Sequence, residues 1–171
     1  MTDTVDHLRS GLALPTVSLV TTEGEAISLA TLPGRSLIIV YPWTGRPGLS
    51  NPPNWDDIPG AHGSTPELEG FRDRAADFAE LGIALYALST QTTDYQREMA
   101  KRLELKFLVL SDFEWSVSRA LRLPSFATGS ENYLKRLSLL TEDGCIAHLF
   151  YPVPEPAGHA EHVLSWLRQR G

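Results

Sequence analysis

Two apolar runs separated by an amphipathic segment constrain the fold of this chain most strongly. Residues 36–41 (SLIIVY) and 83–89 (IALYALS) are almost continuously apolar. Such runs are typical of strands buried on both faces, as at the centre of an α/β sheet. Between them, apolar residues recur at helical spacing and predict a helix over residues 65–81. Strand, helix and strand in this order favour a sheet with parallel neighbours.

The same signals predict the other elements. Strands are expected at residues 14–20, 27–29, 107–110, 134–140 and 146–151, and helices at about 93–105, 112–121 and 159–170. The fold class is therefore α/β, with a central mixed β-sheet flanked by helices. Residues 1–11 are polar and expected to be loose, and residues 12–171 are predicted to form a single domain.

A long stretch with little periodicity, residues 42–63, interrupts this alternation. Loops of this length inside a compact domain are usually functional or disordered. Trp43 and Trp55 favour packing over disorder. We expect the stretch to be ordered and to form a pocket wall or a subunit contact. The alternative is a surface insertion without a role.

Composition excludes several function classes. Twenty-one acidic residues against fifteen basic ones give a net charge of -6, and no basic run suggests nucleic-acid binding. No segment has the pattern of a signal peptide or a membrane span. The single cysteine, Cys145, excludes an internal disulfide and favours a reducing compartment, so a cytoplasmic location is expected. His159 and His162 lack a third ligand, so neither a metal nor another cofactor is predicted.

Residues 59–71 (PGAHGSTPELEGF) predict the start of a helix at Ser64. Pro66 suits a first helical turn, and Glu67 stands at the capping-box spacing from Ser64. Unpaired backbone N–H groups at a helix N-terminus stabilise an anion. A low-pKa thiolate would suit this position, but the residue there is serine.

Three segments carry a family resemblance. They are LPTVSLVTTEGEAISLATLPGRSLIIVYP, GSTPELEGFRD and YLKRLSLLTEDGCIAHLFYP. In this order and spacing the chain resembles the peroxiredoxins, thioredoxin-fold thiol peroxidases, over residues 12–167, and more particularly a bacterial redoxin-like branch. The resemblance implies a thioredoxin-like fold. It places Ser64 where the family has its peroxidatic cysteine and Arg136 where it has its active-site arginine. Ala61 and Glu69 depart from the family pattern, which has a threonine and, in some relatives, a second cysteine at those places.

The resemblance implies thiol-dependent reduction of hydrogen peroxide or an organic hydroperoxide through a cysteine at position 64. A thioredoxin-like or low-molecular-weight thiol would regenerate it, in a monomer or homodimer. The site residues expected on this basis are Ser64, Thr65, Arg136 and Cys145. Cys145 is either an ordinary strand cysteine or a resolving thiol for a sulfenic acid at position 64. Arg136 is either the active-site cation or a surface arginine in an ion pair.

Three interpretations of Ser64 remain open. It is an introduced replacement of cysteine, a natural feature of a relative without peroxidase chemistry, or a plain N-cap serine. A serine hydrolase would call for a G-x-S-x-G elbow, which is missing. The two function classes are therefore an enzyme, inactive with serine at position 64, and a binding or regulatory protein that keeps the thioredoxin fold.

Overall fold

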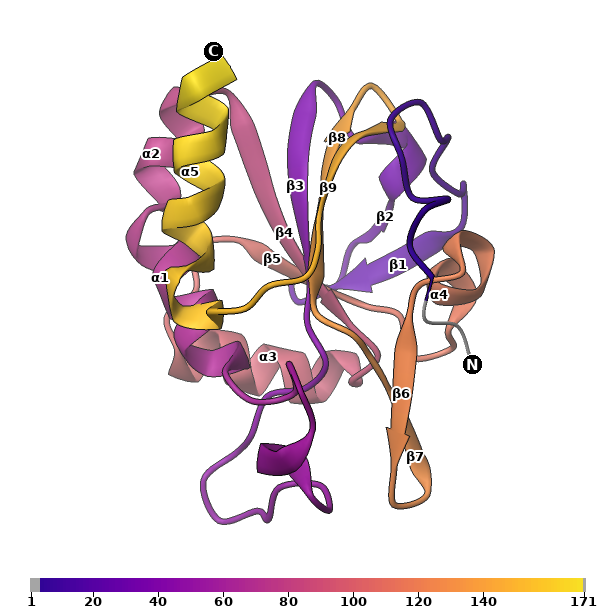
Figure 1. Cartoon of the computed structure of the whole chain (residues 1–171), viewed down its shortest axis with the longest axis vertical. Coiled ribbons are helices and arrows are strands. Elements are labelled where there is room, and N and C mark those ends of the chain that lie inside the picture. Colours follow the sequence, from indigo (N-terminus) through magenta and orange to yellow (C-terminus); the bar gives the residue numbers. More distant parts are fainter. Residues whose placement is uncertain (1–3, 171) are drawn as a thin grey trace.

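The computed structural model describes residues 4–170, which contain a seven-stranded sheet with helices on both faces and a separate two-stranded hairpin (Figure 1). The sheet strands are β1 (Ser18–Thr21), β2 (Ala26–Ser28), β3 (Arg35–Val40), β4 (Ile83–Ser89), β5 (Leu108–Ser111), β8 (Leu137–Glu142) and β9 (Cys145–Phe150). The hairpin strands are β6 (Ser125–Thr128) and β7 (Glu131–Leu134). The helices are α1 (Ser64–Asp73), α2 (Ala75–Glu80), α3 (Thr93–Arg102), α4 (Ser116–Leu121) and α5 (His159–Arg170), with short 3-10 turns η1 (Leu29–Thr31), η2 (Trp55–Asp57) and η3 (Pro156–Gly158).

Strand β3 lies inside the sheet, whose order is β2-β1-β5-β4-β3-β8-β9. It pairs in parallel with β4 and antiparallel with β8, so that Leu37 stands between Leu85 and Leu140. All but the first residue of β3 is buried, because helices or loops cover both faces of the sheet. The predicted α/β fold with a mixed central sheet is confirmed, and residues 36–41 and 83–89 are both central as expected.

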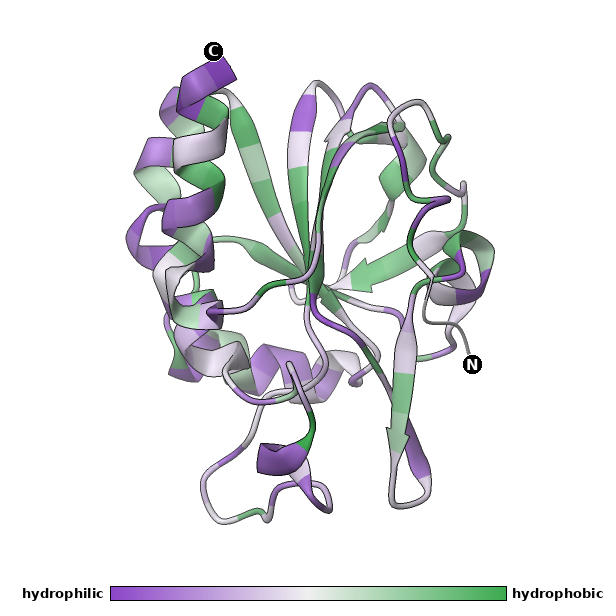
Figure 2. Cartoon of the chain, in the orientation of Figure 1, coloured by the Kyte–Doolittle hydropathy of each residue, from purple (hydrophilic) through white to green (hydrophobic). Residues whose placement is uncertain are grey.

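Two hydrophobic clusters fill the space on the two sides of the sheet. One lies beneath α1, α2, α3 and α5 and includes Phe71, Phe78 and Leu164. The other lies beneath α4, η1 and the N-terminal segment and includes Leu8 and Ile38. In Figure 2 the central strands are largely hydrophobic, whereas the outward faces of the helices are hydrophilic. This distribution is expected for helices that cover a sheet, because each helix turns its single apolar face towards the sheet and its polar face towards solvent.

The structure corrects several element boundaries: β1 begins at Ser18 and α4 at Ser116, later than expected, and two further corrections bear on the site. The helix expected over residues 65–81 is divided at Arg74, whose φ of −110° ends α1 before α2 begins. The strand expected over residues 134–140 begins only at Leu137, because Leu134 belongs to the β6–β7 hairpin and pairs with Ser125. Lys135 and Arg136 therefore lie in the short connection between β7 and β8.

The expectation of a loose N-terminus is wrong for residues 4–11, while residues 1–3 lie outside the described part of the chain. Leu8 is buried in the second cluster. The backbone N–H of Gly11 donates to the carbonyl of Ile146 at 2.8 Å, and an imidazole nitrogen of His7 lies 2.8 Å from the carbonyl oxygen of Leu121. These contacts attach a segment without regular secondary structure to the sheet and to α4.

The stretch of residues 42–63 is ordered and leaves the sheet at the end of β3. Trp55 is buried, and its ring meets Trp43 edge-on with centroids 5.4 Å apart. The same ring contacts Phe126 and Tyr133 of the β6–β7 hairpin, with centroids 5.7 and 5.1 Å away. In Figure 1 the loop and the hairpin extend from the same end of the sheet. Among the described helices, none has the length and apolar character needed to cross a bilayer.

Candidate functional site

Ser64 is the first residue of α1 and is almost completely buried, with 3% of its surface exposed. The preceding Gly63 is the N-cap and has a φ of 113°, a conformation that L side chains rarely adopt. A Cβ added at Gly63 would lie 2.9 Å from Cγ of Pro156, which comes from the segment before α5. Glycine at position 63 thus lets the loop turn sharply into α1 and places Ser64 beneath that segment.

The capping box expected between Ser64 and Glu67 is not formed. Gly63, not Ser64, occupies the N-cap position, and its carbonyl accepts the N–H of Glu67 at 3.1 Å. The side chain of Glu67 points into the protein and is fully buried. Both side chains are therefore available for a different partner.

That partner is Arg136, whose guanidinium is buried beside the start of α1. Its Nη1 donates to Oγ of Ser64 at 3.0 Å and to Oε1 of Glu67 at 2.7 Å. Its other nitrogens donate to backbone carbonyls at the end of the long loop: Nε to Gly60 at 3.2 Å, and Nη2 to Ala61 at 3.0 Å and His62 at 3.4 Å. One side chain from the β7–β8 connection therefore joins the loop end to the first turn of α1. Ser64 and Arg136 are thus in direct contact, although Arg136 lines a neighbouring pocket rather than the one that Ser64 lines.

Glu67 has an unusual protonation equilibrium. Burial raises its pKa from 4.5 to about 7, and this effect outweighs the charge and hydrogen bond of Arg136, which lower it. Oε2 of Glu67 has no hydrogen-bond partner within residues 4–170. Near neutral pH the carboxyl group therefore exchanges between a charged form paired with Arg136 and a neutral form that leaves the positive charge of Arg136 unbalanced next to Ser64.

A pocket of about 180 Å³ opens beside the start of α1. It is lined by Trp43, Gly45, Asn51, Trp55, His62, Gly63, Ser64, Thr65 and Pro66. Thr65, one of the expected site residues, is half-buried and lines this pocket next to Ser64. The expectation that residues 42–63 form a pocket wall is confirmed, with both tryptophans in the wall.

The start of the long loop is held in place by α3 and the segment before it. The side chain of Gln91 accepts from the N–H of Thr44 and donates to its carbonyl, both at 3.2 Å. The hydroxyl of Tyr95 donates to the same carbonyl at 2.9 Å. These bonds fix the loop at one end, as Arg136 does at the other, and so define the shape of the pocket.

Cys145 lies far from this site. It is the first residue of β9 and pairs with Glu142, the last residue of β8, whereas Arg136 directly precedes the first residue of β8. Six residue steps along the strand therefore separate the two, about 20 Å at the usual rise of a strand. Figure 1 shows the β8–β9 turn at the opposite end of the sheet from the start of α1. Because a disulfide needs Cα atoms within about 7 Å, Cys145 cannot reach position 64 of the same chain in this fold.

No base activates the serine hydroxyl in the described part of the chain, where Arg136 is the partner found for Oγ of Ser64. The nearby His62 is exposed and faces Asp56, with Nδ1 and Oδ1 3.2 Å apart. His159 is bonded through Nε2 to the hydroxyl of Ser138 at 2.9 Å. Within residues 4–170 no cluster of three or more His, Cys, Asp or Glu side chains forms a candidate metal site.

A family model places this arrangement among known proteins. The model of the redoxin family matches residues 9–164. The chain belongs to the redoxin family. It is similar to peroxiredoxin Bcp of Escherichia coli (strain K12), with 26% identity over 96% of this chain and 99% of the relative. It is also 25% identical to the chloroplastic peroxiredoxin Q of Sedum lineare, over 92% of this chain and 77% of the relative.

Solved structures of peroxiredoxins share the fold of this redoxin. Peroxidoxin BcpB from Mycobacterium tuberculosis superposes with a TM-score of 0.75 at 20% identity, covering 95% of this chain and 98% of the other. A PrxQ mutant from Xylella fastidiosa gives 0.77 at 17% identity, covering 97% and 99%. The prediction of a bacterial-type, thioredoxin-fold peroxiredoxin, and hence of membership in a family of thiol peroxidases, is confirmed.

The sequence did not identify Glu67 as a member of the site. Its spacing from Ser64 was interpreted as a capping box, although the same i, i+3 spacing also places two side chains on one face of a helix. The sequence also did not predict the role of three backbone carbonyls, those of Gly60, Ala61 and His62, because a backbone acceptor does not depend on residue type. The signal that could have revealed Glu67 is its position next to apolar Leu68 and Phe71 on a helix that packs against a buried sheet.

Proposed function

We propose that position 64 of this redoxin is the peroxidatic position and that the chain is a thiol peroxidase only when a cysteine stands there. With Ser64 the protein does not turn peroxide over. The observation that carries the proposal is the 3.0 Å hydrogen bond from Nη1 of Arg136 to Oγ of Ser64. It places a buried cation and a helix N-terminus on the same side-chain atom.

Both features would lower the pKa of a thiol at position 64 below its usual value of about 8.5. The thiolate would attack one oxygen of the peroxide, the O–O bond would break, and the sulfur would become a sulfenic acid. The departing oxygen takes a proton and leaves as water or, from an organic hydroperoxide, as an alcohol. The guanidinium of Arg136 is placed to stabilise the negative charge that develops on this oxygen. A serine hydroxyl without a base cannot begin this sequence.

Regeneration would require an external thiol. That thiol would attack the sulfenic sulfur, release water and leave a mixed disulfide, which a second thiol would then reduce. A thioredoxin-like protein or a low-molecular-weight thiol, in a reducing compartment such as the cytoplasm, suits this role. The distance from Cys145 to position 64 supports an external reductant over a resolving cysteine in the same chain.

The test is hydrogen peroxide consumption with dithiothreitol as the reductant. The chain as given should match the rate without protein, and Ser64→Cys should exceed it clearly. Intact mass should show the addition of one oxygen to Ser64→Cys after a brief exposure to peroxide. Adding Cys145→Ser should leave the rate of the Ser64→Cys protein unchanged.

Arg136→Lys in the Ser64→Cys background should lower the peroxide rate constant by about 10²-fold, because the fork of donors is lost. Arg97→Lys, in the exposed ion pair with Asp94 and outside the pocket lining, is the matched control and should have no effect. A Ser64→Cys protein that is folded but as inactive as the serine form would reject the enzyme proposal.

That result would favour the second function class, a binding or regulatory protein. The observation in its favour is that Ser64 satisfies Arg136 with a neutral hydroxyl, so the buried cluster is stable without a thiolate. Loss of activity on adding Cys145→Ser would instead show that Cys145 resolves the sulfenic acid between two chains.

A further inference from the structure

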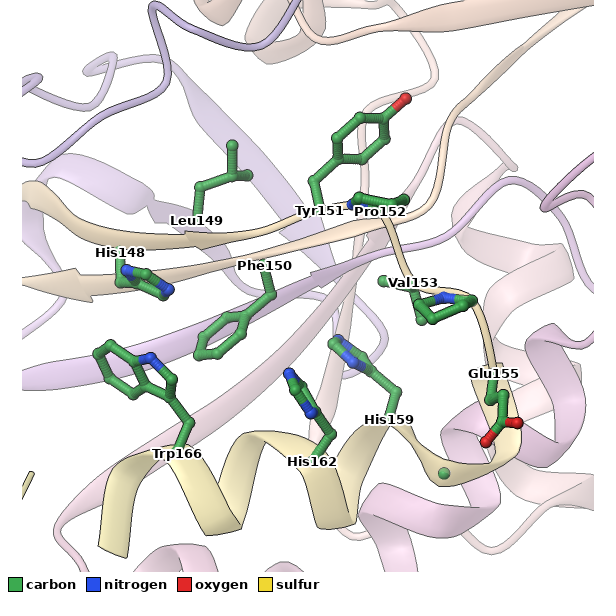
Figure 3. A pocket seen from close by; sticks show the side chains of 12 residues that line it. His148, Leu149, Phe150, Tyr151, Pro152, Val153, Glu155, His159, His162 and Trp166 are labelled. Atoms are coloured by element: carbon green, nitrogen blue, oxygen red, sulfur yellow. The ribbon is translucent and has the colours of Figure 1, made fainter. Parts of the chain in front are cut away.

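A second cavity, of about 320 Å³, lies between β9 and α5 and does not include Ser64 or Arg136 (Figure 3). Its volume is at the lower end of the range of small-molecule sites, about 300–1,000 Å³. Side chains of Phe150 and Trp166 form much of the wall, together with the imidazoles of His148, His159 and His162. Five rings around one cavity form a lining suited to a flat molecule.

Contacts among these rings preform the walls. The imidazole of His148 stacks on Trp166, with centroids 4.2 Å apart and planes inclined by 23°. Phe150 meets Trp166 edge-on at 5.3 Å, and it meets His162 in the same way at 6.3 Å. Figure 3 shows His159, His162 and Trp166 rising from α5 towards the strand that carries His148 and Phe150. A ligand would therefore enter an existing aromatic site rather than create one.

The inner wall carries little charge. Burial lowers the pKa of His159 to about 3, and burial also lowers the pKa of His148, so both rings are neutral near pH 7. Glu155 is the acidic residue of the lining and lies at the exposed rim. Positive charges approach from outside the cavity: Arg170 covers Trp166 at 4.0 Å, and Arg136 acts electrostatically on His159.

We propose that this cavity binds an uncharged, planar aromatic or heteroaromatic molecule that carries a hydrogen-bonding group. An anion would face Glu155, and a cation would face the two arginines, while either ion would lose its hydration against neutral rings. The neutral imidazole of His148 has one N–H donor and one bare nitrogen acceptor, whereas Nε2 of His159 is already bonded to Ser138. Such ring nitrogens suit an amide, a phenol or a ring nitrogen of the ligand. The aromatic walls favour stacked or edge-on contact with a flat ring.

Three probes of the same shape and different charge test the proposal: benzamide, benzamidine and benzoate. Their binding to the chain as given is measured by NMR titration of the indole N–H of Trp166, assigned by its loss in Trp166→Phe. Benzamide should bind and shift this signal. The two ions should bind about tenfold more weakly, because neither recovers its lost hydration in the cavity.

A pair of variants on α5 tests the location. His162→Ala removes an exposed ring from the wall and should weaken benzamide binding about threefold to tenfold, the range for one aromatic contact. Ser165→Ala, exposed on the same helix and outside the lining, should leave it unchanged. The proposal is overturned if benzamide gives no shift at Trp166, if either ion binds as well as benzamide, or if the two variants behave alike.

Discussion

Two arginine–glutamate pairs in this protein have nearly the same geometry and opposite electrostatics. In the site, Nη1 of Arg136 lies 2.7 Å from Oε1 of Glu67, and the two side chains are 2% and 0% exposed. On the surface of α3, Nε of Arg102 lies 2.8 Å from Oε2 of Glu98, with side chains 27% and 36% exposed. Burial raises the pKa of Glu67, whereas the hydrogen bond from Arg102 lowers the pKa of Glu98.

Burial is the largest influence on the pKa of Glu67, whereas Glu98 is exposed and accepts hydrogen bonds from both Arg102 and Arg46. A short distance to an arginine is therefore not enough to keep a buried carboxyl group charged. Water solvates the ionised form of Glu98, so even a modest attraction to an arginine lowers its pKa. Glu67 has lost this solvation, and one arginine does not fully replace it. The buried pair can therefore change its charge near neutral pH next to Ser64, and the exposed pair cannot.

The largest effect is expected from breaking the buried pair. Arg136→Met leaves Glu67 without its cation and frees the three loop carbonyls, so we expect a loss of about 3–5 kcal/mol in the free energy of unfolding. Urea denaturation at neutral pH measures it. Arg102→Met, the matched change in the exposed pair, should destabilise far less. Equal losses in the two variants would show that burial does not make the Arg136–Glu67 pair more important for stability than the Arg102–Glu98 pair.

An intermediate effect is expected in the pH dependence of stability. Because folding raises the pKa of Glu67 from 4.5 to about 7, the folded state holds a proton that the unfolded state loses in this window. The contribution is fully present below about pH 4.5 and is lost as the pH rises to about 7. Relative to Glu67→Gln, the parent chain should lose roughly 3 kcal/mol of stability over this rise. A difference that stays constant with pH would mean that Glu67 is ionised throughout.

The smallest effect, and one of opposite sign, is expected at Glu98. Its pKa is lowered in the folded state, so its contribution is present above the unfolded pKa and is lost as the pH falls through the folded pKa. Relative to Glu98→Gln, the parent chain should therefore lose stability on acidification below about pH 4.5. About 1 M salt should reduce the difference, because the pair is exposed. A loss on raising the pH instead would remove the contrast with Glu67.

The sequence pattern alone was enough to predict the elements that have the same kind of environment along their whole length. Continuous apolar residues identified β3 and β4, since a strand buried on both faces tolerates little else. The apolar stripe of α5 and the Asp143–Gly144 turn before β9 were equally clear. The resemblance to the peroxiredoxins then matched Ser64 and Arg136 to the positions of that family's peroxidatic cysteine and active-site arginine.

Only the tertiary structure decided what surrounds those residues. The β6–β7 hairpin was missed although Gly129 and Ser130 form a two-residue turn signal, because its strands are short and half-exposed. It displaced the start of β8 and so left Arg136 in a connection rather than in a strand. Glu67 shows the physical reason most clearly. Its residue type and spacing suit a solvated cap and a buried ion pair alike, and the choice depends on which segments cover the start of α1.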